Sequence, residues 1–190
     1  MKTAYNRSHV ITVASDLFLR KGLNNTSMDD VVKESGVSKS NIYYHFKSKE
    51  ELLVAVLDYR INMIQQSLHS IQQASHLPVT SRLQLVFASL AEELASRSCI
   101  GGCPIQSLMS APMTVTKDRI NQFFEGMQAM VAMLLSEGVD RGEFRRDIPI
   151  SQTATLFVSA IEGSIMLAES QGDSTVIVQS GETLLHLLQV

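Results

Sequence analysis

The stretch TSMDDVVKESGVSKSNIYYHFKSKEELLVAV, residues 26–56, decides the fold of this chain. Ser27 is a favourable N-cap residue for a short helix, which should end near Ser35 and Gly36 because glycine accommodates a sharp turn. Ser38 is expected to cap a second short helix that runs to about residue 46. Two short helices on either side of a tight turn indicate a helix-turn-helix.

Apolar spacing supports this arrangement. A stripe at helical spacing precedes the stretch and should end at Gly22; it consists of Val10, Val13, Ala14, Leu17 and Phe18. Within the stretch, the residues expected to be buried where the two helices cross are Val31, Val32, Val37 and Ile42. The chain therefore begins with three packed helices.

The rest of the chain also reads as helices. Ser48 and Glu51 form a predicted capping box, and apolar residues then recur every three or four positions, so one helix can continue to about residue 75. Further helices are expected at about residues 80–97, 104–110, 116–141, 151–170 and 175–189, with Pro78, Pro104, Pro112 and Pro149 between them or in their first turns. The predicted fold is all-α with about nine helices. We expect a helix-turn-helix domain over residues 1–47 and a helical effector-binding and dimerisation domain over residues 48–190.

Composition limits the cellular setting and the class of partner. The chain has 190 residues and two cysteines, so a disulfide scaffold is not expected and a cytoplasmic location is favoured. No apolar run is long enough for a membrane span, and no apolar block follows Lys2 and Arg7 as in a signal peptide. Net charge is −3, but residues 1–50 carry eight basic and five acidic side chains. A mildly basic N-terminal segment on an acidic body is compatible with a polyanionic partner, although chance clustering explains so small an excess equally well.

Helical spacing turns one face of the second short helix away from the core. This face carries Lys39, Ser40, Tyr43 and Tyr44. A lysine can donate to guanine or to phosphate, and tyrosines can donate to phosphate. Asn41 can pair with adenine if it reaches the groove. One such helix reads only a few base pairs, so specific binding calls for a dimer on a near-palindromic double-stranded site.

Residues 7–57, which include ASDLFLRKGLNNTS (residues 14–27) and the stretch quoted above, resemble the tetracycline-repressor (TetR) family of transcriptional regulators. The resemblance implies roles in contacting DNA for Thr26, Ser38, Lys39, Tyr43, Tyr44, His45 and Lys49, with Thr26 and Lys49 as phosphate ligands. One departure is Ser40, where many members have glycine, so operator preference cannot be transferred. For His45, a role as a metal ligand is the alternative, but no second ligand stands beside it in the sequence.

The last two predicted helices are apolar on most sides. Residues 154–168 read ATLFVSAIEGSIMLA, in which Glu162 is the only charged residue. Such helices need a cover, and a second copy of the chain can provide it in a four-helix arrangement. A monomeric core is the alternative. The resemblance favours the homodimer.

A pocket for a small apolar or aromatic effector is predicted in the methionine-rich middle of the chain. The candidate lining residues are Phe87, Cys103, Met109, Phe123, Met127, Met130 and Phe157, and the alternative for each is an ordinary core position. The segment CIGGCPIQSL, residues 99–108, resembles one branch of the family in which a cysteine senses electrophiles or oxidants. Cys103 is expected in the first turn of a helix, which favours a reactive thiol, with Cys99 as a resolving partner. The alternative is a small buried residue.

These features predict a ligand-responsive transcriptional regulator. The resemblance implies a repressor, whose long helix beginning near Ser48 is moved by the effector. No metal-binding cluster, phosphate loop or Ser/His/Asp arrangement points to an enzyme, a metal site or another cofactor. The alternatives are a DNA-binding protein without an effector and a small-molecule binding module without a DNA role.

Overall fold

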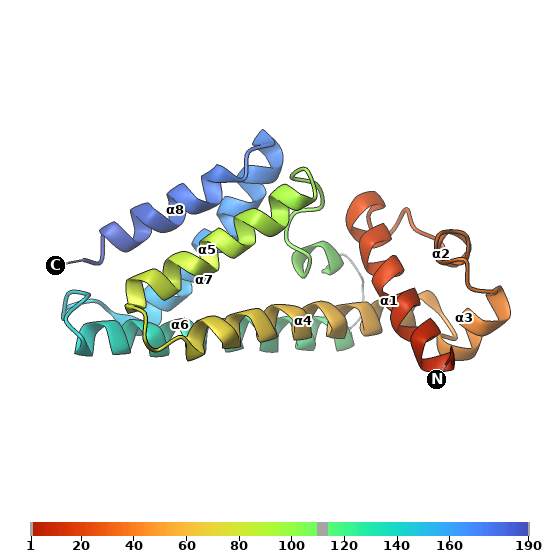
Figure 1. Cartoon of the computed structure of the whole chain (residues 1–190), viewed down its shortest axis with the longest axis horizontal. Coiled ribbons are helices and arrows are strands. Elements are labelled where there is room, and N and C mark those ends of the chain that lie inside the picture. The colour runs from red at the N-terminus through yellow and green to blue at the C-terminus, as the bar shows by residue number, and fades with distance from the viewer. Residues whose placement is uncertain (1, 110–113, 190) are drawn as a thin grey trace. The chain divides into compact units, whose positions relative to one another are not determined.

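The structure is a computed structural model that describes residues 2–109 and 114–189 (Figure 1). In these two ranges the chain forms eight α-helices and one 3₁₀ helix and no strand, which confirms the all-α fold. The helices are α1 (Lys2–Lys21), α2 (Met28–Ser35), α3 (Lys39–His45), α4 (Lys49–Gln73), α5 (Val79–Ser96), the 3₁₀ helix η1 (Gln106–Leu108), α6 (Thr114–Asp140), α7 (Ile150–Gln171) and α8 (Thr175–His186). Pro112 lies outside the described residues, as does Met113 of the methionine-rich region.

The chain divides into two compact units. The first consists of residues 1–64 and 104–118, and the second of residues 65–103 and 119–190. In the first unit, α1 packs against both α2 and α3. Its core includes Phe18, Val31, Ile42 and Phe46, each at most 2% exposed. Val32 and Val37, which we expected to be buried with them, are half-buried.

The caps of the short helices follow the sequence only in part. Ser27 and Asp30 form a capping box at the start of α2, and Gly36 ends the helix at a φ of 65°, where its N–H donates to the carbonyl of Val32. Ser38 is the N-cap residue of α3, as predicted, but its side chain makes no cap hydrogen bond to the helix. Its Oγ instead lies 3.3 Å from Oγ of Ser40.

The start of α4 shows half of the predicted capping box. The N–H of Glu51 donates to Oγ of Ser48 at 3.3 Å, but the Glu51 carboxylate accepts from the N–H of Lys47 at 2.7 Å. Farther along α4, the guanidinium of Arg60 donates to Oγ of Ser15 and, at 3.4 Å, to Asp16. These contacts join α4 to the middle of α1.

In the second unit, α8 packs against both α5 and α7 (Figure 1). The close approach of α5 and α8 depends on Gly181, because a Cβ there would lie 2.4 Å from the ring of Phe87. Near the start of α5, the buried guanidinium of Arg82 donates to the carbonyl of Gln72 at 3.2 Å and to Glu137 at 2.5 Å. Arg141 also pairs with Glu137, at 2.8 Å.

One expectation, for the segment that follows Cys103, was wrong. Over residues 104–109 of the helix predicted at 104–110, the structure has only the single 3₁₀ turn of η1; residue 110 lies outside the described residues. The sequence also contains a helix, α7, that is long and apolar enough to span a membrane by length and composition. Residues of α7 such as Phe157, Ile161 and Ile165 are buried, and the helix packs against α5 and α8 as a core helix of a globular unit does.

Candidate nucleic-acid interface and ligand grooves

The outer face of α3 is polar and aromatic. Ser38, Lys39 and Ser40 are exposed at its start, and Tyr44 is 69% exposed. Tyr43 is half-buried, and its ring lies 6.0 Å from Nζ of Lys39. Nucleic-acid backbones and base edges are bound by surfaces of this composition, in which cationic, hydroxyl and phenol donors project from one helix.

Two lysines of this surface are already bonded within the protein. Nζ of Lys39 donates to the Asp29 carboxylate at 2.8 Å, and this hydrogen bond raises the pKa of Lys39, as does the carboxylate charge. Nζ of Lys47 donates to the carbonyls of Tyr43 and Tyr44, at 3.2 and 3.4 Å, and covers the C-terminal end of α3. Sequence reasoning overlooked both Asp29 and Lys47. For Lys47 the sequence did offer a signal: the residue follows Tyr44 by three positions, so it lies at the C-terminal end of the second short helix.

Asn41 and His45 occupy the side of α3 that faces the protein more than the solvent. Both side chains are half-buried, and Oδ1 of Asn41 and Nε2 of His45 are buried without a hydrogen-bond partner. These two atoms do not face solvent in this conformation, whereas Tyr44 is exposed, and contact of either residue with DNA stays a prediction. Among the described residues, no group of three or more His, Cys, Asp and Glu can hold a metal ion, at His45 or elsewhere.

Thr26 and Lys49, the phosphate ligands implied by the resemblance, bond to the turn between α1 and α2. Thr26 is 1% exposed, and its hydroxyl donates to the carbonyl of Gly22 at 2.9 Å. Nζ of Lys49 donates to the carbonyl of Leu23 at 2.6 Å. In this conformation both side chains hold the turn in place. The single hydroxyl donor of Thr26 is used in its bond, whereas the ammonium of Lys49 has further donors.

Three of the predicted effector residues come together in one groove. Phe123, Met127 and Met130 of α6 line a cavity of about 290 Å³ with the last two turns of α4. The other lining residues are Gln65, Leu68, His69, Gln72, Gly126, Ala129 and Met133. We refer to this cavity as the α4–α6 groove. It is mostly apolar, with two amides and one imidazole from α4 as hydrogen-bonding groups.

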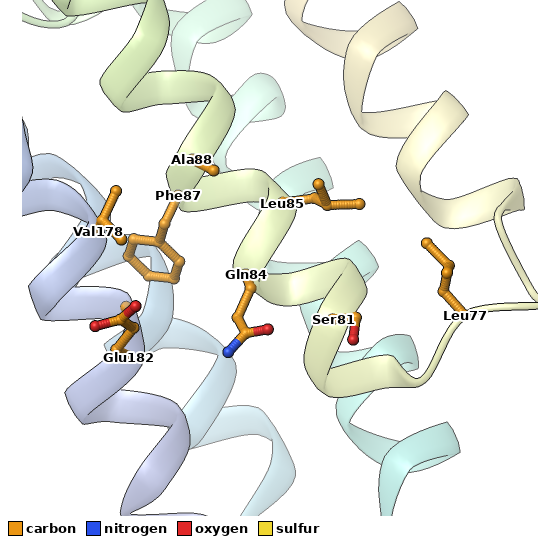
Figure 2. Close-up of a pocket in the computed structure, with 9 residues that line it drawn as sticks. Leu77, Ser81, Gln84, Leu85, Phe87, Ala88, Val178 and Glu182 are labelled. Atoms are coloured by element: carbon orange, nitrogen blue, oxygen red, sulfur yellow. The ribbon is translucent and has the colours of Figure 1, made fainter.

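Phe87 and Phe157 lie elsewhere in the second unit. Their rings are 6.1 Å apart, and each residue is 1% exposed. Phe87 also forms part of a larger groove of about 420 Å³ between α5 and α8, where it lies beside Val178 with Gln84 and Glu182 nearby (Figure 2). Thus the predicted effector residues do not share a single pocket.

The remaining two candidates, Cys103 and Met109, also lie outside the α4–α6 groove. Cys103 precedes η1, which is too short to provide the α-helical N-terminus that we expected to activate its thiol. Its Sγ donates to Oε1 of Glu162 at 3.4 Å. Burial raises the pKa of Glu162, and the hydrogen bond from Cys103 opposes that shift. Met109 belongs to the first unit and is 54% exposed.

Large apolar side chains are exposed on α7 and at the end of α8. On α7 they are Leu156, Met166 and Leu167, which are 54%, 59% and 46% exposed, and just after α8 Leu187 is 64% exposed. Apolar residues gathered in this way on neighbouring helices mark an interaction surface in many soluble proteins.

Comparison with known proteins identifies the family. Residues 10–56 match the profile of the bacterial regulatory proteins of the tetR family, and residues 79–183 match that of the tetracyclin repressor-like C-terminal domain. The HTH-type transcriptional repressor DhaR of Mycobacterium sp. (strain GP1) is 26% identical over 161 residues, which cover 84% of this chain and 80% of DhaR. The HTH-type transcriptional regulator QacR of Staphylococcus aureus is 42% identical over 52 residues, 27% of this chain and 28% of QacR.

Solved structures agree on the fold. The regulatory protein TetR from Rhodobacter sphaeroides superposes with a TM-score of 0.87 at 20% identity, over 95% of this chain and 97% of its own. The C-terminal profile alone spans more than half of the chain, and the N-terminal profile covers the helix-turn-helix. This chain therefore belongs to the tetR family of bacterial transcriptional regulators, which bind DNA through a helix-turn-helix and are not enzymes.

Proposed function

We propose that this protein is a ligand-responsive repressor that binds a near-palindromic operator as a homodimer in the cytoplasm. The observation that carries the proposal is the exposed face of α3, with Lys39, Ser40 and Tyr44, in a chain of the tetR family. In this proposal residues 1–47 bind operator DNA, and residues 48–190 bind the effector and the second subunit.

The DNA-binding role is tested by fluorescence anisotropy with duplexes that cover the intergenic DNA beside the gene. We expect an affinity that falls steeply between about 50 and 200 mM salt, because phosphate contacts release counterions. Lys39→Ala should weaken binding, because it removes a cationic donor from the exposed face of α3. Lys117→Ala removes an exposed lysine of α6 outside the helix-turn-helix and serves as the matched control. Failure of the wild-type chain to bind any neighbouring promoter would support a binding module without a DNA role.

The homodimer is supported by the exposed apolar side chains of α7 and α8. A second copy of the chain related by a two-fold axis would cover this surface in both subunits at once. Leu167→Glu places a charge in it, and sedimentation velocity should then show a monomer. Leu85→Glu is the control, because Leu85 of α5 is similarly exposed, at 43% against 46% for Leu167, but lies outside the surface. Equal behaviour of the two variants would argue against this interface.

For the effector, we propose the α4–α6 groove and a small, largely apolar or aromatic molecule. Three methionines and Phe123 supply adaptable apolar contacts, and His69 with its neighbouring glutamines supplies polar ones. Because one wall belongs to α4, occupation of the groove can favour a different position of this helix and so change the spacing of two DNA-binding domains. A protein whose operator affinity does not respond to any bound small molecule would fit the alternative of an effector-independent DNA-binding protein.

An electrophilic effector is a second candidate, favoured by the contact of Cys103 with the Glu162 carboxylate. When the sulfur of Cys103 forms a bond to a carbon atom of the electrophile, the Glu162 carboxylate can accept the thiol proton. Cys103 is 7% exposed. Release from DNA by an electrophile such as N-ethylmaleimide should be lost in Cys103→Ser and kept in Cys99→Ser. Unchanged release in Cys103→Ser would make this cysteine a structural residue.

A further inference from the structure

The acidic residues of α2 have different partners. Asp30 completes the capping box with Ser27, and its pKa is lowered by the hydrogen bonds from that residue. Glu34 pairs with Arg20 of α1 at 2.9 Å. Asp29 instead pairs with Lys39, the first residue of α3, at 2.8 Å. Thus one acidic side chain of α2 neutralises a cation of the predicted DNA-contacting face.

This ion pair does little to hold the fold together. The side chain of Asp29 is 73% exposed and that of Lys39 is 62% exposed, and solvent-exposed pairs contribute little to stability. Asp29 also lies in the first turn of α2, where the helix dipole favours a negative charge without any cation. Lys39 can therefore leave Asp29 without disturbing α2, and the pair acts on the availability of Lys39.

We propose that Asp29 is a specificity-determining residue that selects against phosphate, in favour of neutral base acceptors, as the partner of Lys39 in DNA. The inference rests on the proposed DNA-binding function. It assigns to Asp29 a role that lies outside the set of direct DNA contacts.

The physical reason lies in the donors of the lysine ammonium. The ammonium has three N–H donors, of which Asp29 accepts one. The O6 and N7 atoms of guanine are uncharged acceptors, so they can use the remaining donors while Asp29 stays in place. A phosphate brings a full negative charge next to the Asp29 carboxylate, and this repulsion must be overcome or the ion pair broken. Binding to random DNA, which depends on phosphates, is therefore weakened more than binding to an operator.

The position of the Lys39 side chain supports the same conclusion. Asp29 holds Nζ on the side of α3 where it lies 6.0 Å from the ring of Tyr43. A restrained side chain loses less rotational freedom when it meets a base at a fixed position. A free lysine would instead reach several phosphates along the backbone, which favours binding without sequence selection.

The test compares Asp29→Asn with wild type on two 30-base-pair duplexes, one of random sequence and one selected in vitro with the wild-type chain. We expect Asp29→Asn to bind the random duplex about two- to fivefold more tightly, the range for loss of an exposed ion pair. The slope of log affinity against log salt should steepen by about one, for one added phosphate contact. Affinity for the selected duplex should change less, so the ratio of the two affinities should fall.

The matched control is Glu34→Gln, which removes one negative charge from the same helix and breaks an exposed ion pair of similar length. If Glu34→Gln gained as much affinity for the random duplex, the gain would come from the lower negative charge of α2 in general, and the inference would be overturned. A gain that persists when Asp29→Asn is placed on a Lys39→Gln background would overturn it as well, since Asp29 would not then act through Lys39.

The role of Asp29 and the DNA-binding function can be refuted separately. Tight, salt-dependent binding of both duplexes by wild type, with no change in Asp29→Asn, would refute the role of Asp29 and leave the DNA-binding function intact. Absence of binding of either duplex by the folded wild-type chain would refute the proposed function and the inference together.

Discussion

The ion pair between Arg82 and Glu137 should respond unequally to the loss of its two members. The side chain of Arg82 is 2% exposed, whereas that of Glu137 is 34% exposed. Replacement of Glu137 leaves a buried guanidinium that still donates to the carbonyl of Gln72 at 3.2 Å. Replacement of Arg82 leaves a partly hydrated carboxylate that still pairs with Arg141 at 2.8 Å. We therefore expect Glu137→Met to be more destabilising than Arg82→Met.

The expected costs of the two substitutions differ by roughly twofold. Removal of one partner of a buried ion pair costs about 3–5 kcal/mol when the remaining charge stays buried. For a chain of this length, each kcal/mol lowers Tm by about 2–4 °C, so Glu137→Met should lower Tm by about 6–20 °C. Arg82→Met loses a hydrogen bond to a charged group but leaves no isolated buried charge, at a cost of about 1.5–3 kcal/mol or about 3–12 °C.

The measurement is thermal unfolding followed by circular dichroism at one fixed protein concentration, because association makes Tm depend on concentration. Both variants introduce a methionine, so each serves as a control for the effect of a methionine side chain on packing. A Tm for Arg82→Met equal to or below that of Glu137→Met would refute the reasoning. The remaining charge on residue 137 would then be the costly one, despite its exposure.

Three further changes should give measurable effects. Gly181→Ala should lower stability by about 1–3 kcal/mol in urea unfolding, because its Cβ would overlap an aromatic ring of α5, whereas Gly126→Ala, whose Cβ meets nothing within 4 Å, should not destabilise. Burial raises the pKa of the Glu162 carboxyl above its usual 4.5. The contribution of Glu162 to folding stability is therefore present below about pH 4.5 and is lost as the pH rises through the folded-state pKa. Glu162→Gln should be more stable than wild type at pH 8, and equal Tm values at that pH would contradict this. Met127→Trp should fill the α4–α6 groove and reduce binding of the dye 1-anilinonaphthalene-8-sulfonate, which exposed Met109→Trp should leave unchanged.

Local chemistry explains why the helix-turn-helix could be predicted so closely. The capping box of Ser27 and the turn at Gly36 depend on residues within a few positions of each other, so the sequence displays them directly. Ser38 was correctly placed as the N-cap of α3, but its hydroxyl contacts that of Ser40 and makes no cap hydrogen bond. Of the candidate effector residues, Phe123, Met127 and Met130 line one groove, since they are spaced four and three residues apart along α6.

Features that depend on distant residues could not be read in this way. Cys103 and the preceding loop are held by α7, since Glu162 accepts from its thiol and Glu169 accepts from the N–H of Gly101. These contacts replace the helix that Pro104 suggested. The place of Phe87 between α5 and α8 likewise depends on Gly181, which follows it in the sequence by more than ninety residues. A glycine of this kind looks the same in sequence as one that merely ends a helix.

The contacts of α4 with the first unit have a mechanical consequence. Lys49 fastens the first turn of α4 to the carbonyl of Leu23, and Arg60, three turns later, fastens it to Ser15 and Asp16 of α1. Because α4 is hydrogen-bonded at two separate points, it cannot rotate about either one alone. A rotation of α4 is therefore passed to the helix-turn-helix as well as a translation. Residues 49–60 of α4 and the helix-turn-helix should therefore turn as one rigid piece. In a dimer, the separation and the tilt of the two recognition helices would then be set together, so a change in either would spoil the fit to both half-sites at once.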